Sequence, residues 1–304
     1  MEAVDTIIIG AGPAGLTAAL YLARYEKKTL VLTEDIGGQA ATSGEVANYP
    51  AFELISGSEL TQKMLEQVKK YPTVEVRFPA EVKSVEKKGD LFEVSTKEKV
   101  YQAKTVLITA GKRHRTLGVP DEEKLVGKGL SYCATCDGPF AKGRKTVIIG
   151  GGNSAADAAL ILAKIAKQIT VLNLTDKMKA ETVRLNRIRM GKNTRIINNA
   201  KATKIDTQNG KIASVVYEDK SGKEQLIETE MVFVEIGYMP NTEIFSDMVE
   251  LNENKEIVVK ADCSTKTEGL YAAGDITDTP HKQVIIACGE GAKAAMSINK
   301  ALEK

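Results

Sequence analysis

The chain has 304 residues, which at about 150 residues per domain suggests two domains. Apolar residues make up 43% and charged residues 27%, values that are ordinary for a globular protein and argue against intrinsic disorder. The 42 Lys and Arg residues nearly balance the 40 Asp and Glu residues, which argues against a general binder of nucleic acid or anionic membranes. No apolar run reaches the ~18 residues that predict a membrane-spanning helix.

The N-terminal residues, MEAVDTIIIG, run from acidic side chains straight into an apolar strand. A secretory signal peptide needs a basic start and a longer apolar segment, so we expect a cytoplasmic protein. The cysteines are too few for a disulfide scaffold, and cytosolic thiols normally stay reduced. The close pair Cys133 and Cys136 therefore needs a metal or a redox explanation.

Residues 6–32 and 146–172 are two copies of one pattern. They align without a gap, and 13 of the 27 positions are identical. Each copy has a short apolar strand, a glycine-rich turn, a helix rich in Ala and Leu, and a second strand at 29–32 or 169–172. This order predicts a βαβ unit that occurs twice.

The glycines of the first copy have separate roles. Gly10 allows a tight turn, Gly12 lets a pyrophosphate approach the main chain, and Gly15 lets the helix pack closely on the strand. The helix N-terminus then offers N–H groups to the phosphates. One such motif can be a packing turn alone, but two copies in the same context predict two dinucleotide sites. The implied contacts are Gly10, Gly12, Pro13, Ala14 and Gly15 in the first copy, and Gly150, Gly152, Asn153 and Ser154 in the second.

The segment CATCD at 133–137 lies shortly before the second copy. A flavin and a nicotinamide together transfer hydride, and a Cys-x-x-Cys dithiol is a suitable two-electron acceptor. The alternative is half of a zinc site. Cys263 and Cys288 are 25 residues apart and form no second Cys-x-x-Cys, so we expect no metal.

With these motifs in this order, the chain resembles the low-molecular-weight thioredoxin reductase family over essentially its whole length. It is also similar to the flavoprotein part of the alkyl hydroperoxide reductase flavin subunit, most closely at GGGNSAADAA and KQVIIACGEGAKA. That subunit usually has an N-terminal thioredoxin-like module, which we do not expect here because the first fingerprint starts at residue 6. The motifs that carry the resemblance are GGQ at 37–39, NYP at 48–50, TAG at 109–111, CATCD at 133–137, GYMPNT at 237–242 and GLYAAGD at 269–275.

The resemblance implies an α/β fold with two Rossmann-like, three-layer dinucleotide-binding domains, one of which is discontinuous. Residues 1–115 and 246–304 would bind FAD, and residues 116–245 would bind the nicotinamide and carry the dithiol. Alternating apolar residues within 73–108 and 211–235 predict a small antiparallel sheet in each domain. Members of the family are typically homodimers.

The resemblance also assigns positions around FAD. Asp275 would bond the ribityl chain, and the helix opening at Lys282, Gln283 and Val284 would aim its N-terminus at the flavin ring. Glu34 is the candidate for the adenosine ribose, with Asp35 as its neighbour. The other implied positions are Gly37, Gly38, Gln39, Asn48, Val82, Thr109, Ala110, Gly111 and Gly274. Gly237, in the crossover segment, is a further implied cofactor position.

For the reaction, the resemblance implies electron flow from nicotinamide through FAD and Cys133–Cys136 to thioredoxin or a thioredoxin-like protein. Cys136 would lie against the flavin and attack the partner disulfide, and Cys133 would resolve the mixed disulfide. Asp137 would be the acid–base for the thiolate, and it also suits a helix N-cap.

The nicotinamide preference depends on a departure from the family pattern. NADPH-dependent members have His-Arg-Arg-x-x-x-Arg after the second strand, and the aligned residues here are Asn173, Leu174, Thr175 and Lys179. A 2′-phosphate would lose its bidentate partners, and a lysine does not replace them. We therefore expect NADH, with Asn173 bonding the ribose diol and Lys179 nearby; an electron donor other than nicotinamide is a third possibility.

Three other functions compete with a thioredoxin-disulfide reductase. The first is a reductase of a peroxiredoxin system that acts through a separate thioredoxin-like protein. The second is a dithiol oxidase of the same fold, which passes electrons to oxygen. The third is a non-enzymatic zinc or flavin-binding module.

Overall fold

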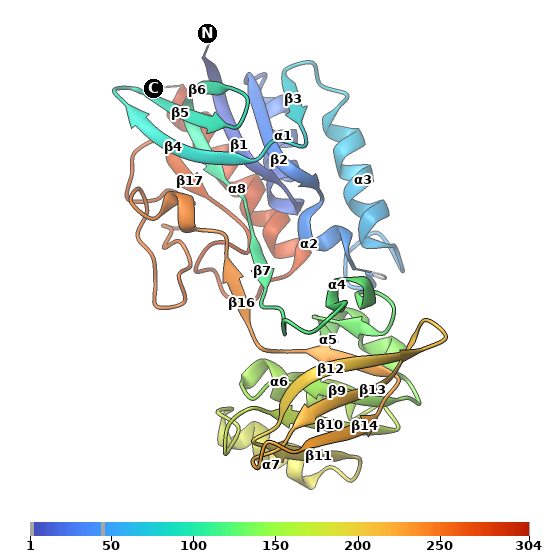
Figure 1. The fold of residues 1–304 in the computed structure, drawn as a ribbon. Coiled ribbons are helices and arrows are strands. Elements are labelled where there is room, and N and C mark those ends of the chain that lie inside the picture. The colour runs from blue at the N-terminus through green and yellow to red at the C-terminus, as the bar shows by residue number, and fades with distance from the viewer. Residues whose placement is uncertain (1–2, 44–45, 304) are drawn as a thin grey trace. The chain divides into compact units, whose positions relative to one another are not determined.

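The computed structural model describes residues 3–43 and 46–303, and the chain divides into two compact units. The first unit spans residues 1–113 and 239–304, and the second spans 114–238 (Figure 1). The boundaries expected from the sequence lie two and seven residues further along the chain. The two crossing segments, β7 (Lys112–His114) and β16 (Tyr238–Pro240), pair with each other in a two-stranded sheet.

The first unit is built on a parallel sheet whose central strands are buried on both faces, as their continuous apolar runs predict. The N-terminal part of β6 also pairs antiparallel with β5, which forms a hairpin with β4. The parallel strands lie in the order β3 (Val74–Arg77), β2 (Thr29–Ile36), β1 (Val4–Ala11), β6 (Val100–Ile108) and β17 (Leu270–Ala272), and the hairpin strands are β4 (Val82–Lys88) and β5 (Leu91–Thr96).

Each face of this sheet has its own apolar core. Ile8 and its same-face neighbours pack against the three long helices, whereas Ile7 packs against the hairpin and the segment after residue 245. This alternation is the period of two that a β-strand imposes on its side chains. The helices of the unit are α1 (Pro13–Arg24), α2 (Gly38–Ala41), α3 (Gly57–Val68) and α8 (Val284–Leu302), with the 3₁₀ turn η2 (Glu243–Phe245).

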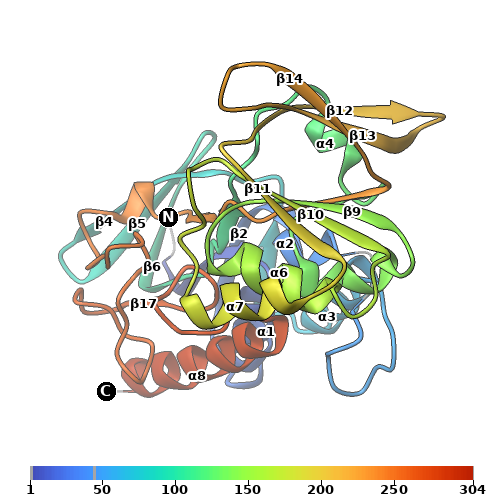
Figure 2. The same ribbon diagram turned by 90° about the horizontal axis from the view of Figure 1, so that it is seen from below.

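The second unit repeats the plan with a five-stranded parallel sheet. Helices α6 and α7 lie on one side of it, and a three-stranded antiparallel sheet covers the other (Figure 2). The order is β11 (Thr194–Asn198), β10 (Gln168–Asn173), β9 (Lys145–Ile149), β15 (Met231–Val234) and β8 (Leu130–Ser131). The remaining elements are α4 (Glu122–Leu125), α5 (Ala134–Asp137), η1 (Gly138–Ala141), α6 (Asn153–Leu162), α7 (Thr182–Met190), β12 (Lys201–Gln208), β13 (Lys211–Glu218) and β14 (Glu224–Glu228).

The α/β class and the presence of an antiparallel sheet in each unit agree with the sequence prediction, but three strands differ from it. The strand β12 belongs to the antiparallel sheet of the second unit although it lies before the expected segment 211–235. Both β3 and β15 fall inside the segments that were expected to form antiparallel sheets. The structure instead pairs β3 in parallel with β2, and β15 in parallel with β9. Over the part of the chain that the structure describes, no helix has the length and apolar character needed to cross a bilayer.

Candidate functional site

The second unit contains the cysteine pair singled out by the sequence. Cys133 and Cys136 form a disulfide with their Cα atoms 5.3 Å apart, at the start of the single-turn helix α5. Cys133 is the N-cap of this helix, and its Sγ accepts the main-chain N–H of Cys136 at 3.2 Å. Such a bond favours a thiolate on Cys133 once the disulfide is open.

Asp137 lies beside this pair as the last residue of α5. Its Oδ2 accepts a hydrogen bond from the Ser131 hydroxyl at 2.7 Å, and the same hydroxyl accepts the Cys133 N–H at 3.0 Å. The N-cap of α5 is Cys133, whereas Asp137 is the N-cap of the following 3₁₀ turn η1, where its side chain makes no capping hydrogen bond. The sequence analysis missed Ser131, although a serine two residues before the first cysteine was the available signal.

Glu235 is a second residue that the sequence analysis missed. It follows β15, where its N–H donates to the Ile149 carbonyl at 2.7 Å, and it is buried. Its Oε1 accepts the Ala134 N–H at 3.3 Å in the first turn of α5. An added Cβ at Gly150 would come within 2.2 Å of the Glu235 carbonyl oxygen. One residue thus contacts both the dithiol helix and the second glycine-rich turn.

The second glycine-rich turn leaves open space where a ligand phosphate would lie. Gly152 is the N-cap of α6, and a Cβ added there would meet no described atom within 4 Å. Asn153 and Ser154 open the helix and are exposed, and the Asn153 Oδ1 accepts the Glu181 N–H at 2.9 Å. A helix N-terminus with unshielded N–H groups suits a pyrophosphate.

Asn173 does not have the environment expected for a ribose contact. Its side chain is 2% exposed, and its amide nitrogen donates to the Thr175 carbonyl at 2.9 Å and to the Asn198 Oδ1 at 2.8 Å. Its Oδ1 lies where a Cβ on Gly151 would stand, at 1.9 Å. Both amide N–H groups are used inside the unit, so the expectation that Asn173 bonds the ribose diol is corrected.

The residues after Asn173 define the adjoining surface. Leu174 is 65% exposed, and Lys179 is exposed while its N–H donates to the Gly151 carbonyl at 2.7 Å. Arg184 on α7 is bonded to Asp157 at 2.6 Å and also to Glu181. These two carboxylates offset the charge of the arginine on this part of α7.

In the first unit, the first glycine-rich turn has the packing that its sequence predicts. Gly10 has a φ of +106°, and an added Cβ would lie 2.5 Å from the Thr109 carbonyl oxygen. A Cβ on Gly15 would lie 2.0 Å from the Gly10 oxygen. At Gly12, before Pro13 and Ala14 begin α1, no described atom lies within 4 Å of such a Cβ. The turn is therefore closed toward the protein and open on the ligand side.

Several expected FAD positions lie around this opening. A Cβ on Gly38 would have only the Gly12 Cα as a described neighbour, at 3.8 Å, so these glycines form one open strip. Gly37 has a φ of +89° and caps α2, in which Gln39 donates to the Lys112 carbonyl. Glu34 is exposed at the end of β2, whereas Asp35 accepts the Gly38 N–H at 3.0 Å. This difference leaves Glu34 as the better ribose candidate.

The segment after β6 is tied to the crossover segment. Thr109 donates to the Gly10 carbonyl at 2.8 Å, and the Ala110 carbonyl accepts the Asn241 side-chain amide at 2.7 Å. Gly111 accepts the Asn241 main-chain N–H at 3.1 Å. Asn241 was visible only as part of the GYMPNT motif. Of two other expected positions, Val82 begins β4, and Gly237 in the second unit accepts the Arg115 N–H at 3.1 Å.

Asp275 follows β17 in a charged, largely buried cluster. The Lys112 Nζ is 3.8 Å from its Oδ2, and the Lys282 Nζ is 3.2 Å from Glu256. Burial raises the pKa of Asp275 and lowers that of Lys112, and each group's charge partly offsets the effect on the other. Lys112 was missed, although it directly follows the TAG motif. Two lysines and a carboxylate suit the polar part of a flavin cofactor.

Helix α8 begins where the sequence analysis placed it. Gln283 is its N-cap and accepts the Asn48 side-chain amide at 3.0 Å, and Val284 is its first residue. Glu290 in this helix is buried, and its Oε2 accepts the Gly274 N–H at 2.7 Å. The sequence analysis missed Glu290, although an acidic residue among the small residues of ACGEGAKAA could have indicated a buried hydrogen-bond acceptor.

The other two cysteines are buried thiols in the first unit. Cys263 is 2% exposed, and burial raises its pKa to about 11; burial also raises the pKa of Cys288. Within residues 3–43 and 46–303, no group of three or more His, Cys, Asp or Glu side chains is placed to hold a metal ion.

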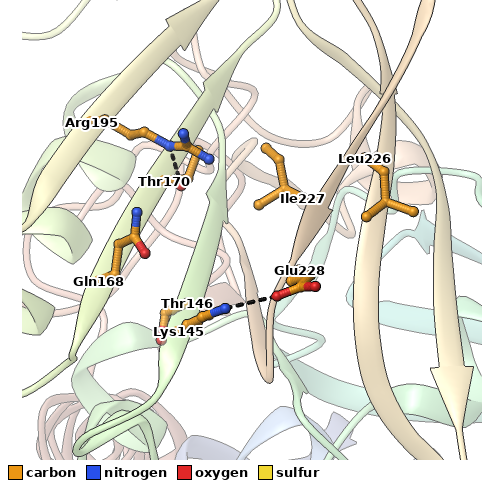
Figure 3. Close-up of a pocket in the computed structure, with 8 residues that line it drawn as sticks. All are labelled: Lys145, Thr146, Gln168, Thr170, Arg195, Leu226, Ile227 and Glu228. Atoms are coloured by element: carbon orange, nitrogen blue, oxygen red, sulfur yellow. Dashed lines mark hydrogen bonds and ion pairs between the residues drawn. The ribbon is translucent and has the colours of Figure 1, made fainter.

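One further cavity, of about 200 Å³, lies in the second unit away from the dithiol (Figure 3). Its basic side chains have partners: Lys145 pairs with Glu228 at 2.8 Å, and the Arg195 Nε donates to Thr170 at 2.9 Å. The cavity contains none of the glycine-turn or dithiol residues. Its lining is Lys145, Thr146, Gln168, Thr170, Arg195, Leu226, Ile227 and Glu228.

Comparison with known proteins adds a family and several relatives. The family model for pyridine nucleotide-disulphide oxidoreductases matches residues 4–293. A thioredoxin reductase of Bacillus subtilis is 38% identical over 302 residues, which are 99% of this chain and 95% of the relative. The F subunit of the alkyl hydroperoxide reductase of Escherichia coli is 37% identical over 300 residues, or 97% of this chain and 58% of that relative.

Two solved structures that are similar to this chain are also thioredoxin reductases. A thioredoxin reductase from Streptococcus pyogenes is 34% identical with a TM-score of 0.90, and the match covers 99% of this chain and 98% of that one. The thioredoxin reductase of T. acidophilum is 38% identical with a TM-score of 0.71, and each chain is covered completely.

Proposed function

Because the chain belongs to the pyridine nucleotide-disulphide oxidoreductase family, we propose that it reduces the disulfide of thioredoxin, using FAD and, preferentially, NADH. The observation that carries this proposal is the Cys133–Cys136 disulfide beside Asp137, in a unit that has its own open glycine-rich turn. A family enzyme needs a redox-active disulfide that can pass two electrons to an external one, and this pair fits that role.

The first unit fits FAD through its open strip at Gly12 and Gly38 and through the cluster around Asp275. We assign the pyrophosphate to the N-terminus of α1 and the polar flavin edge to Asp275, Lys112 and the N-terminus of α8. When bound, FAD supplies the transfer of two electrons between the nicotinamide and the disulfide. The second unit would hold the nicotinamide cofactor at Gly150, Gly152, Asn153 and Ser154.

The chain's own residues stabilise the thiolate and transfer the protons. Once the disulfide is open, the Cys136 N–H stabilises a thiolate on Cys133, the reactive form of a thiol. Asp137, oriented by Ser131, is positioned to give a proton to this pair or to take one from it. One thiol attacks the thioredoxin disulfide, and the other closes the protein disulfide again, so that thioredoxin leaves with two thiols.

The NADH preference is inferred from the surface after β10. Leu174 and Thr175 stand where NADPH-dependent members have arginines, and Lys179 provides a single point charge. The guanidinium group of Arg184 on α7 forms ion pairs with the carboxylates of Asp157 and Glu181. A 2′-phosphate would thus lack charge-assisted bidentate partners, whereas a ribose diol needs none.

The similarity to the alkyl hydroperoxide reductase relative supports a second candidate, a reductase that serves a peroxiredoxin system through a thioredoxin-like protein. This chain spans a little over half of that relative, so the activity of the whole relative is not transferred to it. Thioredoxin and a peroxiredoxin adaptor, offered separately to the purified enzyme with NADH, distinguish the two candidates by which one is reduced.

A matched pair of serine variants tests the proposal. We expect Cys136→Ser and Cys133→Ser each to abolish reduction of protein disulfides, while both keep NADH-dependent reduction of a dye that needs only the flavin. Anaerobic titration with NADH, followed by thioredoxin, measures both properties. Persistent thioredoxin turnover in either variant would contradict the assignment. The variant that keeps the attacking thiol is identified by its stable mixed disulfide with thioredoxin.

A further inference from the structure

Tyr132, the residue directly before Cys133, is held at three points within the second unit. Its ring stacks on His114, with centroids 4.4 Å apart and planes 17° apart. Its hydroxyl donates to the Glu122 Oε1 at 2.6 Å, and its main-chain carbonyl accepts the Tyr238 hydroxyl at 3.0 Å. His114 and Tyr238 are the first and last residues of the unit, and their rings also meet at 4.8 Å.

Glu122 is itself held in a fixed position, so it can fix the hydroxyl of Tyr132. It is 4% exposed, and its carboxylate also accepts the N–H groups of Leu117 and Gly118, both at 2.9 Å. A buried carboxylate with three donors is well satisfied and holds a fixed position. Burial and the neighbouring carboxylate raise the pKa of Tyr132, so its hydroxyl remains a donor at any working pH.

The dithiol helix needs such support because it is very short. A four-residue helix has little stability of its own, since forming the first turn fixes several dihedral angles for one hydrogen bond. In the oxidised protein the disulfide bond itself keeps the two sulfurs together. In the dithiol state this bond is gone, and the position of Cys133 depends on the chain on either side of it.

We propose that His114, Glu122 and Tyr238 are positioning residues that act through Tyr132 to keep Cys133 within closing distance of Cys136 in the dithiol state. The proposal rests on the proposed function only in that the pair cycles between disulfide and dithiol. When glutathione opens the pair, two glutathione thiols become one glutathione disulfide, and two electrons and two protons pass to the cysteines. A looser anchor lowers the effective concentration of one thiol near the other, and this favours the dithiol.

The test measures this equilibrium in the FAD-loaded enzyme. Wild type and variants are held anaerobically in glutathione buffers at pH 7, quenched with acid and alkylated. Mass spectrometry of the tryptic peptide 129–142, which contains both cysteines, then gives the dithiol fraction. We expect Tyr238→Phe and His114→Ala to shift the equilibrium toward the dithiol by about threefold to tenfold, where tenfold corresponds to about 30 mV.

Two further variants make the result specific. His114→Phe keeps a ring for stacking on Tyr132, so its dithiol–disulfide equilibrium should equal that of wild type. Tyr217→Phe removes the hydroxyl of another buried tyrosine of the same unit, in β13, and should cause no shift. A shift in Tyr217→Phe as large as in Tyr238→Phe would overturn the proposal.

Wild-type equilibria in both Tyr238→Phe and His114→Ala would also overturn it, whether or not the enzyme reduces thioredoxin. If His114→Ala fails to fold, Tyr238→Phe decides alone, because it removes a single oxygen atom. An enzyme that shows the expected shifts but leaves thioredoxin oxidised would refute the proposed function and uphold this inference.

Discussion

Single side chains in this protein are explained by hydrogen-bond partners that the sequence pattern did not indicate. Asn173 is polar and ends a strand, yet its amide bonds Thr175 and Asn198 in the interior. Aspartate is a residue type that favours helix N-caps, but the carboxylate of Asp137 accepts a hydrogen bond from the hydroxyl of Ser131. In each case the residue type was noticed in the sequence, and its partner depended on how the strands and loops meet.

At the residue scale, the nicotinamide preference can be altered at two positions. We expect the double variant Leu174→Arg and Thr175→Arg to raise kcat/KM for NADPH relative to NADH by about a hundredfold or more. The reason is that each charge-assisted bond to the 2′-phosphate contributes about 1.5–3 kcal/mol. Steady-state kinetics with both nucleotides measure the ratio.

The control for this change is Leu226→Arg, an arginine at another exposed apolar position of the same unit. It adds positive charge away from the glycine-rich turn and should leave the ratio unchanged. An equal ratio in the double variant and in wild type would show that the 2′-phosphate does not bind beside residues 174 and 175.

Thiol reactivity gives a second prediction at this scale. With a pKa of about 11, Cys263 has on the order of 0.1% thiolate at pH 8. As long as the pH is below this pKa, each increase of one pH unit raises the thiolate fraction about tenfold. Labelling of Cys263 by iodoacetamide in the folded, reduced protein should therefore accelerate from pH 7 to pH 10 without a plateau. Mass spectrometry follows each cysteine, and Cys133 and Cys136 should label far faster at pH 8. A plateau for Cys263 below pH 9 would contradict the prediction.

At the scale of elements, α1 and α6 are equivalent helices that begin at open glycines. Gly12 and Gly152 have φ values of −74° and −96°, which any residue adopts, and no described atom lies within 4 Å of an added Cβ. A methyl group at either position therefore fits the protein itself. It would occupy the space through which a pyrophosphate approaches the helix.

We therefore expect Gly12→Ala to fold but to bind FAD at least about tenfold more weakly, because the methyl group pushes the pyrophosphate off the helix N-terminus. Gly152→Ala should remain yellow and raise the KM for NADH by a similar factor. Fluorescence titration of the apoprotein with FAD and steady-state kinetics measure the two effects.

The matched contrast is Gly15→Ala in the same helix. Its Cβ would stand 2.0 Å from the Gly10 carbonyl oxygen, so this variant should lower the unfolding temperature of the apoprotein itself. If Gly12→Ala destabilises the apoprotein as much as Gly15→Ala does, the open space at Gly12 has a structural role and not a binding role.

Two strands show why elements can be misassigned from pattern alone. Residues 74–77 alternate like an edge of an antiparallel sheet, and β3 is indeed an edge strand, but it pairs in parallel with β2. The run at 231–234 is fully buried because β15 lies between β9 and β8. Alternation reports which face of a strand is buried and says nothing about the direction of its neighbour.

At the scale of the whole molecule, each unit has apolar cores formed from its own residues. The positions expected to bind FAD lie in the first unit, and the second glycine-rich turn and the dithiol lie in the second. A ligand that binds one unit should therefore stabilise that unit most directly.

We expect the apoprotein to unfold in two calorimetric transitions. FAD at a hundred times its Kd should stabilise only the transition of the first unit, by about 2.7 kcal/mol, and NAD⁺ should raise only that of the second. Limited proteolysis during heating assigns the transitions. Gly12→Ala should lose the response to FAD and keep the response to NAD⁺. A single transition that both ligands raise together would show that the units unfold as one.

The sequence alone determined the α/β class, the two dinucleotide turns and the redox-active pair, because these features depend on residues close together in the chain. Glycine spacing, the strand–turn–helix order and Cys-x-x-Cys are local patterns whose chemistry is the same wherever the fold places them. The tertiary structure decided the rest: the interior position of Asn173, the support of the dithiol helix by Glu235, and the contacts of Tyr132 with His114 and Tyr238. These depend on hydrogen bonds and stacking between residues as many as 106 positions apart, which only the paired strands bring together.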